Sequence, residues 1–198
     1  MFINYNYSLI FVICYLIGSI PFGLLLSKVT KKNDPRLYGS KNIGATNMLR
    51  VGGLKVGIFT LIFDITKGFI PIKLLIIYDQ QEMLALAIFS LICGHLYPVW
   101  LKFKGGKGVA TFIGILMGYN LILFFTFILT WLFFSILFKY SSLSALMAII
   151  VNLILVTNLS ELKIMFLITS LLIIYKHKEN IRRLLEGKET KIIFKKKN

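Results

Sequence analysis

Residues 109–138 read VATFIGILMGYNLILFFTFILTWLFFSILF, a run of thirty residues without a charge. A helix needs about 20 residues to cross the apolar core of a membrane, so this run is too long for one crossing and short for two. Gly118, Tyr119 and Asn120 are the residues at which a helix would most easily be interrupted. We therefore expect a short helix before this break and a second helix after it.

The same apolar character extends over most of the chain. Of its 198 residues 57% are hydrophobic, and its mean hydropathy is +0.80, far more apolar than a soluble domain needs. Further spans are expected at Leu9–Leu26, Val56–Ile77, Met83–Leu101, Leu143–Val156 and Leu162–Tyr175. The sequence predicts an all-α, polytopic integral membrane helix bundle of about seven transmembrane helices, several of them short or tilted, in a single domain over residues 1–198. Five spans are the alternative if the short pairs are re-entrant.

The charged residues indicate the orientation and the kind of partner. The chain carries 23 Lys and Arg against 8 Asp and Glu, a net charge of +15. Because these cations border apolar spans, they favour attraction to membrane lipid and phosphate, and no nucleic acid is expected as a partner. The seven-span arrangement puts 20 of the 23 cations on one face, so the positive-inside rule predicts an outer N-terminus and a cytoplasmic C-terminus. Cys14 and Cys93 lie inside apolar runs and predict neither a disulfide nor a metal site.

The first basic segment with glycines is GSKNIGATN, residues 39–47. Glycines let backbone N–H groups approach an oxyanion, and lysine supplies a countercharge. Thr46 or Asn47 could cap a new helix that carries Arg50 about one turn later. A glycine-rich turn that leads into a helix N-terminus is suited to anions, although a polar loop with ordinary turn glycines would look the same.

The second segment is KGGKG, residues 104–108. It is no Walker A loop, because Leu101 stands where the upstream glycine is required, so nucleotide hydrolysis is not indicated. A basic membrane anchor would need only lysine. The three glycines around Lys107 therefore favour close backbone approach to a ligand.

The third segment follows the last span. His177, Asn180, Arg183 and Glu186 have helical spacing and could share one face. A snorkelling juxtamembrane helix would explain its cations, but it would need neither the histidine nor the asparagine.

Ionisable residues also lie within the predicted spans. Asp64 and Lys67 are three residues apart in one span, where charged groups are costly, and a structural pair that supports the site is the favoured interpretation. We interpret His95 as an interhelical histidine that at most supports the site.

These segments resemble the signature of the bacterial membrane acyltransferases that use acyl phosphate to acylate glycerol 3-phosphate. The matching stretches cover nearly the whole chain: Gly18–Gly23, Gly39–Arg50, Asp64 with Lys67 and Gly68, Gly94 and His95, Phe103–Thr111, Tyr140–Leu143, and His177–Ile181 with Gly187 and Glu189. One departure is Lys41, where the family commonly has glycine.

The resemblance implies a reaction in which a fatty acyl group passes from acyl phosphate to glycerol 3-phosphate, giving 1-acyl-glycerol 3-phosphate and inorganic phosphate, as the first acylation of phospholipid synthesis. It implies a bacterial cytoplasmic membrane location with the active site on the cytoplasmic face, and no metal or other cofactor. The implied catalytic residues are Ser40, Arg50, Lys107, His177 and Asn180. The implied substrate-binding residues are Gly39, Asn42, Gly44, Thr46, Asn47, Lys104, Gly105, Gly106, Gly108 and Ser142. The general base stays open between His177 and a substrate phosphate oxygen.

Two other classes of membrane protein are alternatives. A transporter or channel for phosphorylated solutes would place its charges at mid-depth in the membrane, whereas the candidate groups cluster at one predicted face. An alcohol phosphotransferase or prenyltransferase would need aspartate-rich metal motifs, and this chain has aspartate only at positions 34, 64 and 79.

Overall fold

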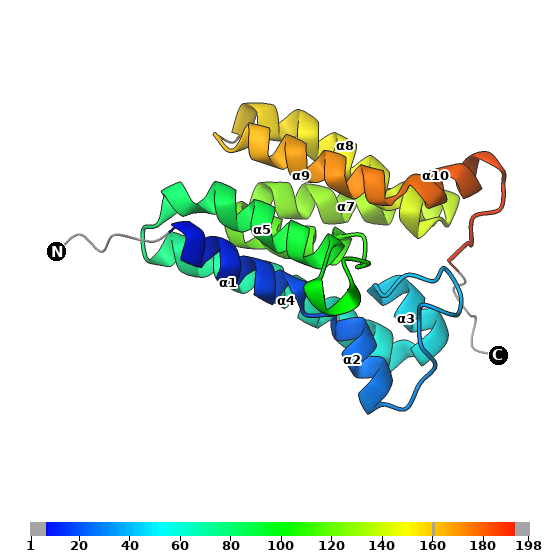
Figure 1. The fold of residues 1–198 in the computed structure, drawn as a ribbon. Helices are drawn as coiled ribbons and strands as arrows, with labels where there is room; N and C mark the ends of the chain where they lie inside the picture. The colour runs from blue at the N-terminus through cyan, green and yellow to red at the C-terminus, as the bar shows by residue number, and fades with distance from the viewer. Residues whose placement is uncertain (1–6, 160, 193–198) are drawn as a thin grey trace. The chain divides into compact units, whose positions relative to one another are not determined.

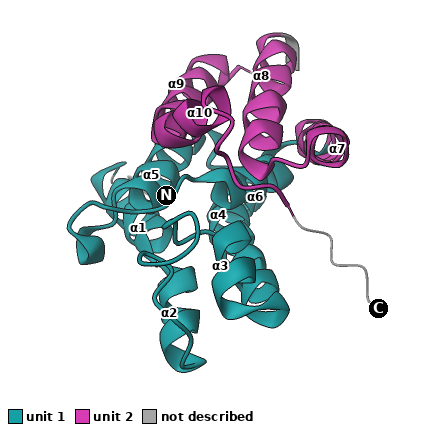
Figure 2. Ribbon diagram, turned by 90° about the vertical axis from the view of Figure 1, so that its right-hand side faces the viewer, with its two compact units in different colours: residues 1–121 teal, residues 122–198 magenta. Residues whose placement is uncertain are grey.

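The computed structural model describes residues 7–159 and 161–192, and within them it forms ten α-helices and two short 3-10 helices (Figure 1). The all-α prediction is confirmed. The helices fall into two compact units, residues 1–121 and 122–198 (Figure 2). The predicted break in residues 109–138 is also confirmed, because one helix ends at Tyr119 and the next begins at Leu121.

The first unit contains the helices around the first two basic segments, residues 39–47 and 104–108. Its helices are α1 (Tyr7–Ser19), α2 (Phe22–Val29), α3 (Ala45–Gly52), α4 (Leu54–Ile77), η1 (Gln81–Met83), α5 (Leu84–Leu96), η2 (Val99–Leu101) and α6 (Val109–Tyr119). Helix α1 packs along α5, α6 packs along α4, and the short α3 packs on α4.

The first expected span, Leu9–Leu26, is broken. Helix α1 ends at Ser19 and α2 begins at Phe22, and the two helices are bent by 42°. Pro21 lies at the break, where its ring prevents a continuous helical hydrogen-bond pattern. The break leaves backbone groups of the chain without helical partners in the middle of an apolar region.

The close pairing of α4 with α6 depends on glycine. A side chain at Gly68 of α4 would strike the carbonyl oxygen of Thr111, and one at Gly114 of α6 would strike the carbonyl oxygen of Ile65. The two backbones therefore touch directly, the packing that small residues allow between membrane helices.

The second unit contains α7 (Leu121–Phe138), α8 (Ser141–Leu159), α9 (Lys163–Lys176) and α10 (Lys178–Leu185), with the first residue of α7 at the boundary. Large apolar side chains of α7 are exposed, among them Leu129, Phe133 and Ile136. Such a row of exposed apolar side chains would promote aggregation in water, but it suits contact with lipid.

By length and composition, two helical stretches of the described residues could each cross a membrane alone, Gln81–Leu101 and α7, and the bent pair α1–α2 makes a third if it is one span. Helix α4, with 24 residues, has the length but carries Asp64 and Lys67. Helix α6 has only 11 residues, so the expectation of several short helices agrees with the structure.

We predict that Gly114→Val lowers the stability of the protein, because the added side chain forces α6 away from Ile65 of α4. The free energy of unfolding should fall by roughly 1–3 kcal/mol, the usual cost of overpacking. Thermal unfolding in detergent would measure it. Met117→Val, at a partly exposed position of the same helix, is the control, and equal melting temperatures for the two variants would contradict the prediction.

Candidate active site

The first loop, residues 34–44, is organised by the side chain of Asn47. Its Oδ1 accepts a hydrogen bond from the Ser40 backbone N–H at 2.9 Å. Its Nδ2 donates to three carbonyl oxygens, those of Pro35 (2.9 Å), Tyr38 (3.1 Å) and Asn42 (2.8 Å). Asn47 is 1% exposed, so its amide acts within the loop itself. The cap predicted for Thr46 or Asn47 is wrong: α3 begins at Ala45 after Gly44, and Asn47 lies inside the first turn.

Two residues of the first loop have left-handed backbone conformations. Gly39 has φ +63°, and a side chain there would strike Oδ1 of Asn47. Lys41 has φ +58°, a conformation that glycine adopts with less strain than lysine. This backbone conformation is compatible with the glycine that the resemblance implies at position 41. The lysine is exposed beside Ser40.

The second loop, residues 102–108, lies against the end of α5. The Gly105 N–H donates to the Leu96 carbonyl and the Gly106 N–H to the His95 carbonyl, both at 3.1 Å. Side chains at these glycines would collide with His95. The close approach that Gly105 and Gly106 permit is thus to His95, and their predicted role in substrate binding stays a prediction. Lys104 is exposed, and Gly108, with φ +86°, precedes α6.

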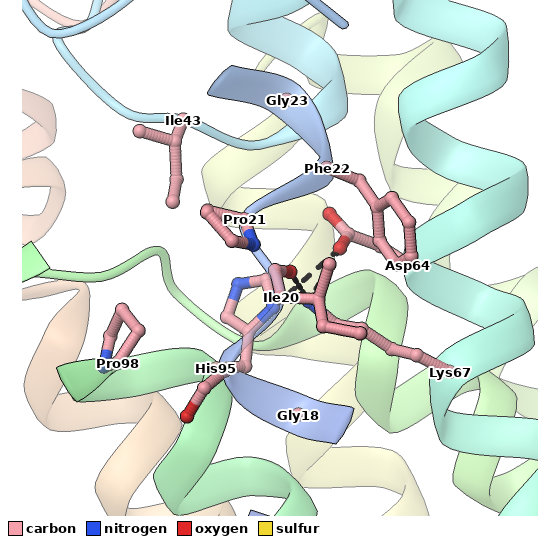
Figure 3. Close-up of a pocket in the computed structure, with 11 residues that line it drawn as sticks. Gly18, Ile20, Pro21, Phe22, Gly23, Ile43, Asp64, Lys67, His95 and Pro98 are labelled. Carbon is pink, nitrogen blue, oxygen red and sulfur yellow. Dashed lines mark hydrogen bonds and ion pairs between the residues drawn. The ribbon is translucent and has the colours of Figure 1, made fainter. Parts of the chain in front are cut away.

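A small hollow lies beside these loops within the first unit (Figure 3). It is lined by residues 18–23 at the break between α1 and α2, by Ile43 of the first loop, and by Asp64, Lys67, His95 and Pro98.

Asp64 and Lys67 form a buried ion pair at 2.7 Å, as the sequence predicted for a structural pair. The Lys67 ammonium also donates to the carbonyl oxygen of Ile20 at 2.9 Å and lies over the Phe22 ring. Lys67 thus adds a side-chain donor to the Ile20 carbonyl at the break of the first span, where the Phe22 N–H also donates.

In the second unit, His177 lies between α9 and α10 and is 2% exposed. Its Nδ1 is 2.8 Å from the carbonyl oxygen of Ile173. A carbonyl only accepts, so Nδ1 carries the hydrogen, and in the neutral ring the lone pair is on Nε2.

Glu189 brings together three residues of the second unit. Its Oε1 accepts hydrogen bonds from Ser142 Oγ at 2.8 Å and from Asn180 Nδ2 at 2.7 Å. Its Oε2 accepts from Arg183 Nε at 2.7 Å. Burial alone would raise the pKa of Glu189, but the hydrogen bonds from Asn180, Arg183 and Ser142 outweigh it and hold the pKa below its ordinary value. Glu189 is therefore an anion at neutral pH.

A turn after α10 carries Glu189 back to this position. Gly187 has φ +67°. Its N–H donates to the Leu184 carbonyl, and the Lys188 N–H donates to the Arg183 carbonyl, the two bonds of a Schellman helix end. Glu186, the acidic residue of the predicted shared face, pairs with Arg182 and Lys188 at the surface. The shared face itself stays a prediction.

The structure groups the candidate residues within each unit. The first unit holds both basic loops, with Ser40, Arg50 and Lys107, and the second holds Ser142, His177 and Asn180. Convergence of the third segment on the first two stays a prediction. Glu189 and Thr111, which contacts His95, were missed as site residues, although both lay within the quoted motifs. Among residues 7–159 and 161–192, no group of three His, Cys, Asp or Glu side chains could hold a metal ion.

Fold and site together define a helical integral membrane protein with basic, glycine-bearing loops beside buried polar groups. A family model described as glycerol-3-phosphate acyltransferase matches residues 8–187. The glycerol-3-phosphate acyltransferase of Pelagibacter ubique (strain HTCC1062) is 44% identical over 187 residues, which cover 94% of this chain and 97% of that one. That of Bartonella quintana (strain Toulouse) is 47% identical, covering 95% and 92%.

Two solved structures are similar over nearly the whole chain. The crystal structure of PlsY, an integral membrane glycerol 3-phosphate acyltransferase, in its glycerol 3-phosphate form has a TM-score of 0.89 and 34% identity, covering 94% of this chain and 96% of that one. The lysophosphatidic acid form has a TM-score of 0.84 and 33% identity, covering 94% and 95%. The chain belongs to the glycerol-3-phosphate acyltransferase family.

We predict that Glu189→Gln destabilises the second unit, because a neutral amide neither balances Arg183 nor accepts all three hydrogen bonds. The loss should be roughly 2–3 kcal/mol, typical of hydrogen bonds to a charged group, and thermal unfolding would measure it. The pKa of Glu189 is lowered on folding, so its contribution is present above the unfolded pKa and disappears as the pH falls through the folded pKa.

Glu186→Gln is the matched control, because Glu186 makes only surface ion pairs in the same segment. Equal melting temperatures for the two variants at neutral pH would refute the prediction that Glu189 stabilises the second unit.

Proposed function

We propose that this protein transfers a fatty acyl group from acyl phosphate to the 1-hydroxyl of glycerol 3-phosphate, giving 1-acyl-glycerol 3-phosphate (lysophosphatidic acid) and inorganic phosphate. The hydroxyl oxygen forms a bond to the acyl carbon, and the bond from that carbon to the phosphate oxygen breaks. The hydroxyl proton ends on the released phosphate, so the reaction balances without a cofactor. Its product belongs to the start of phospholipid synthesis.

The observation that carries the choice of donor is the hydrogen bonding of the two histidines. A thioester donor commonly requires a histidine base whose Nδ1 is oriented by a carboxylate. Here Nδ1 of His177 bonds to a backbone carbonyl at 2.8 Å, and Nδ1 of His95 lies 3.0 Å from the Thr111 hydroxyl. Asp64 is 3.9 Å from His95 and is bound more closely by Lys67. An acyl phosphate brings its own good leaving group and needs less help from a base.

The basic loops have an immediate use in such a reaction. Both substrates carry phosphate, and catalysis can consist mainly of positioning them and neutralising charge. In the proposal, Arg50 and Lys107 supply countercharge, and the glycine loop around Asn42–Thr46 cradles the acyl phosphate. Ser40, Ser142 and Asn180 supply hydrogen bonds, and Asn47 holds the first loop in shape through its four hydrogen bonds.

The proton of the attacking hydroxyl has two possible acceptors. Nε2 of His177 carries the lone pair in the neutral ring, because Nδ1 donates to Ile173. A phosphate oxygen of the substrate could serve instead. His177→Ala separates them, because loss of a base lowers kcat, whereas loss of a binding contact raises KM at unchanged kcat.

The proposed location is the bacterial cytoplasmic membrane, with the site at the cytoplasmic face. The support is the charge distribution, since 20 of the 23 Lys and Arg lie on one side in the seven-span arrangement. A membrane site would also let the fatty chain of the donor lie among apolar helices while its phosphate meets the basic loops.

The proposed function is tested with purified protein in lipid or detergent. We expect phosphate release from long-chain acyl phosphate that depends on glycerol 3-phosphate and persists in the presence of a metal chelator, with no transfer from acyl-CoA. Robust turnover of acyl-CoA would refute the donor assignment. Movement of glycerol 3-phosphate across vesicles without acylation would favour the transporter alternative.

We predict that Lys107→Ala and Arg50→Ala each lower kcat/KM by roughly 30- to 5,000-fold, the equivalent of about 2–5 kcal/mol for a charge left without its partner. Lys102→Ala is the control, because this exposed lysine has a left-handed backbone in the same loop but no proposed contact with substrate. All three variants should unfold at the wild-type temperature. Wild-type activity in both Lys107→Ala and Arg50→Ala would refute the proposal that the basic loops bind substrate phosphate.

A further inference from the structure

His95 contacts the second loop on one side and the first turn of α6 on the other. Its carbonyl accepts the Gly106 N–H at 3.1 Å, next to the bond from Gly105 to Leu96. Its Nδ1 and the Thr111 hydroxyl share a hydrogen bond at 3.0 Å. These anchors at positions 105, 106 and 111 lie on both sides of Lys107 in the chain.

The imidazole ring also fills the space beside the loop. A side chain on Gly106 would run into Nε2 of His95, and one on Gly105 would run into the His95 carbonyl oxygen. The loop backbone therefore rests on the ring and on the end of α5 together. The fit explains these two glycines without a ligand.

The buried Asp64–Lys67 pair of α4 lies close to the ring. The His95 side chain is 5% exposed, and Asp64 lies 3.9 Å from Nδ1. Asp64 and Lys67 neutralise each other at 2.7 Å, and Lys67 is fixed in turn on the Ile20 carbonyl. Figure 3 shows His95 beside this pair at the hollow. The groups beside the ring are thus buried, bonded to one another and electrically balanced.

We propose that His95 is a positioning residue that holds the second loop so that Lys107 presents its charge to a substrate phosphate. The proposal rests on the function proposed above. His95 acts through the backbone of Gly105 and Gly106 and through Thr111, and takes no part in proton transfer. A shift of the loop would displace Lys107. Binding of a phosphorylated substrate would then weaken more than the rate of the chemical step falls.

The kinetic test compares His95→Ala, His95→Asn and Thr111→Val with Thr60→Val. The asparagine amide can occupy the place of Nδ1 and keep the bond to Thr111, but it cannot fill the space beside Gly106. Thr60 is the matched control, because it is as buried as Thr111 and its hydroxyl bonds only to the Val56 carbonyl of its own helix.

We expect His95→Ala to raise the KM of the substrate whose KM is also raised by Lys107→Ala, by about five- to tenfold, with a smaller change in kcat. His95→Asn and Thr111→Val should fall between His95→Ala and the wild type, and Thr60→Val should match the wild type. Combining His95→Ala with Lys107→Ala should have less effect than the product of the single changes. A fall in kcat at unchanged KM, or fully multiplicative effects, would overturn the proposal.

Amide hydrogen exchange gives a readout that does not need activity. Without substrate, the Gly105 and Gly106 amides should exchange faster in His95→Ala than in wild type or Thr60→Val, while the amides of α7 stay unchanged. Wild-type exchange at both glycines in a folded His95→Ala protein would overturn the proposal. If the wild type transfers no acyl group, the proposed function fails, whereas faster exchange would still show that His95 holds the loop.

Discussion

Backbone polar groups at breaks of membrane helices within the apolar core must find partners inside the protein, because lipid offers none. This requirement accounts for many of the buried polar side chains described above. Lys67 reaches the carbonyl of Ile20 where the first span breaks. Asn47 binds one N–H and three carbonyl groups of the first loop. The second loop uses carbonyl groups at the end of α5. Each irregular segment is therefore stabilised by particular bonds.

The same arrangement separates two uses of polar residues. Those that hold the loops in shape are buried and have identified partners, as Asn47 and His95 do. The cations Lys41 and Lys104 are exposed on the loops that these residues fix. Loops fixed by internal hydrogen bonds, with exposed charges on them, suit the proposed site, since little freedom would be lost when a phosphorylated substrate binds.

The apolar pattern predicted the long helices, because a run of uncharged residues in a membrane has few alternatives to a helix, but it missed the break between α1 and α2. The break at residues 118–120 and the Asp64–Lys67 pair were also predictable from short-range spacing. The bonding of Asn47, His95 and Glu189 was not, because their partners depend on how the backbone turns between them. Asn47 was a candidate cap but lies inside the first turn of α3, and the left-handed turn at Gly187 brings Glu189 to Asn180 and Arg183.

The bond from Ser142 to Glu189 joins residues 47 positions apart in the chain. The ribosome therefore synthesises the residues of α8, α9 and α10 before it adds Glu189. The carboxylate of Glu189 bonds to α8 through Ser142 and to α10 through Arg183. Until that residue emerges, Arg183 and Asn180 lack the anion they share in the finished protein. A chain whose synthesis stops before Glu189 therefore lacks the carboxylate that bonds to Ser142, Asn180 and Arg183.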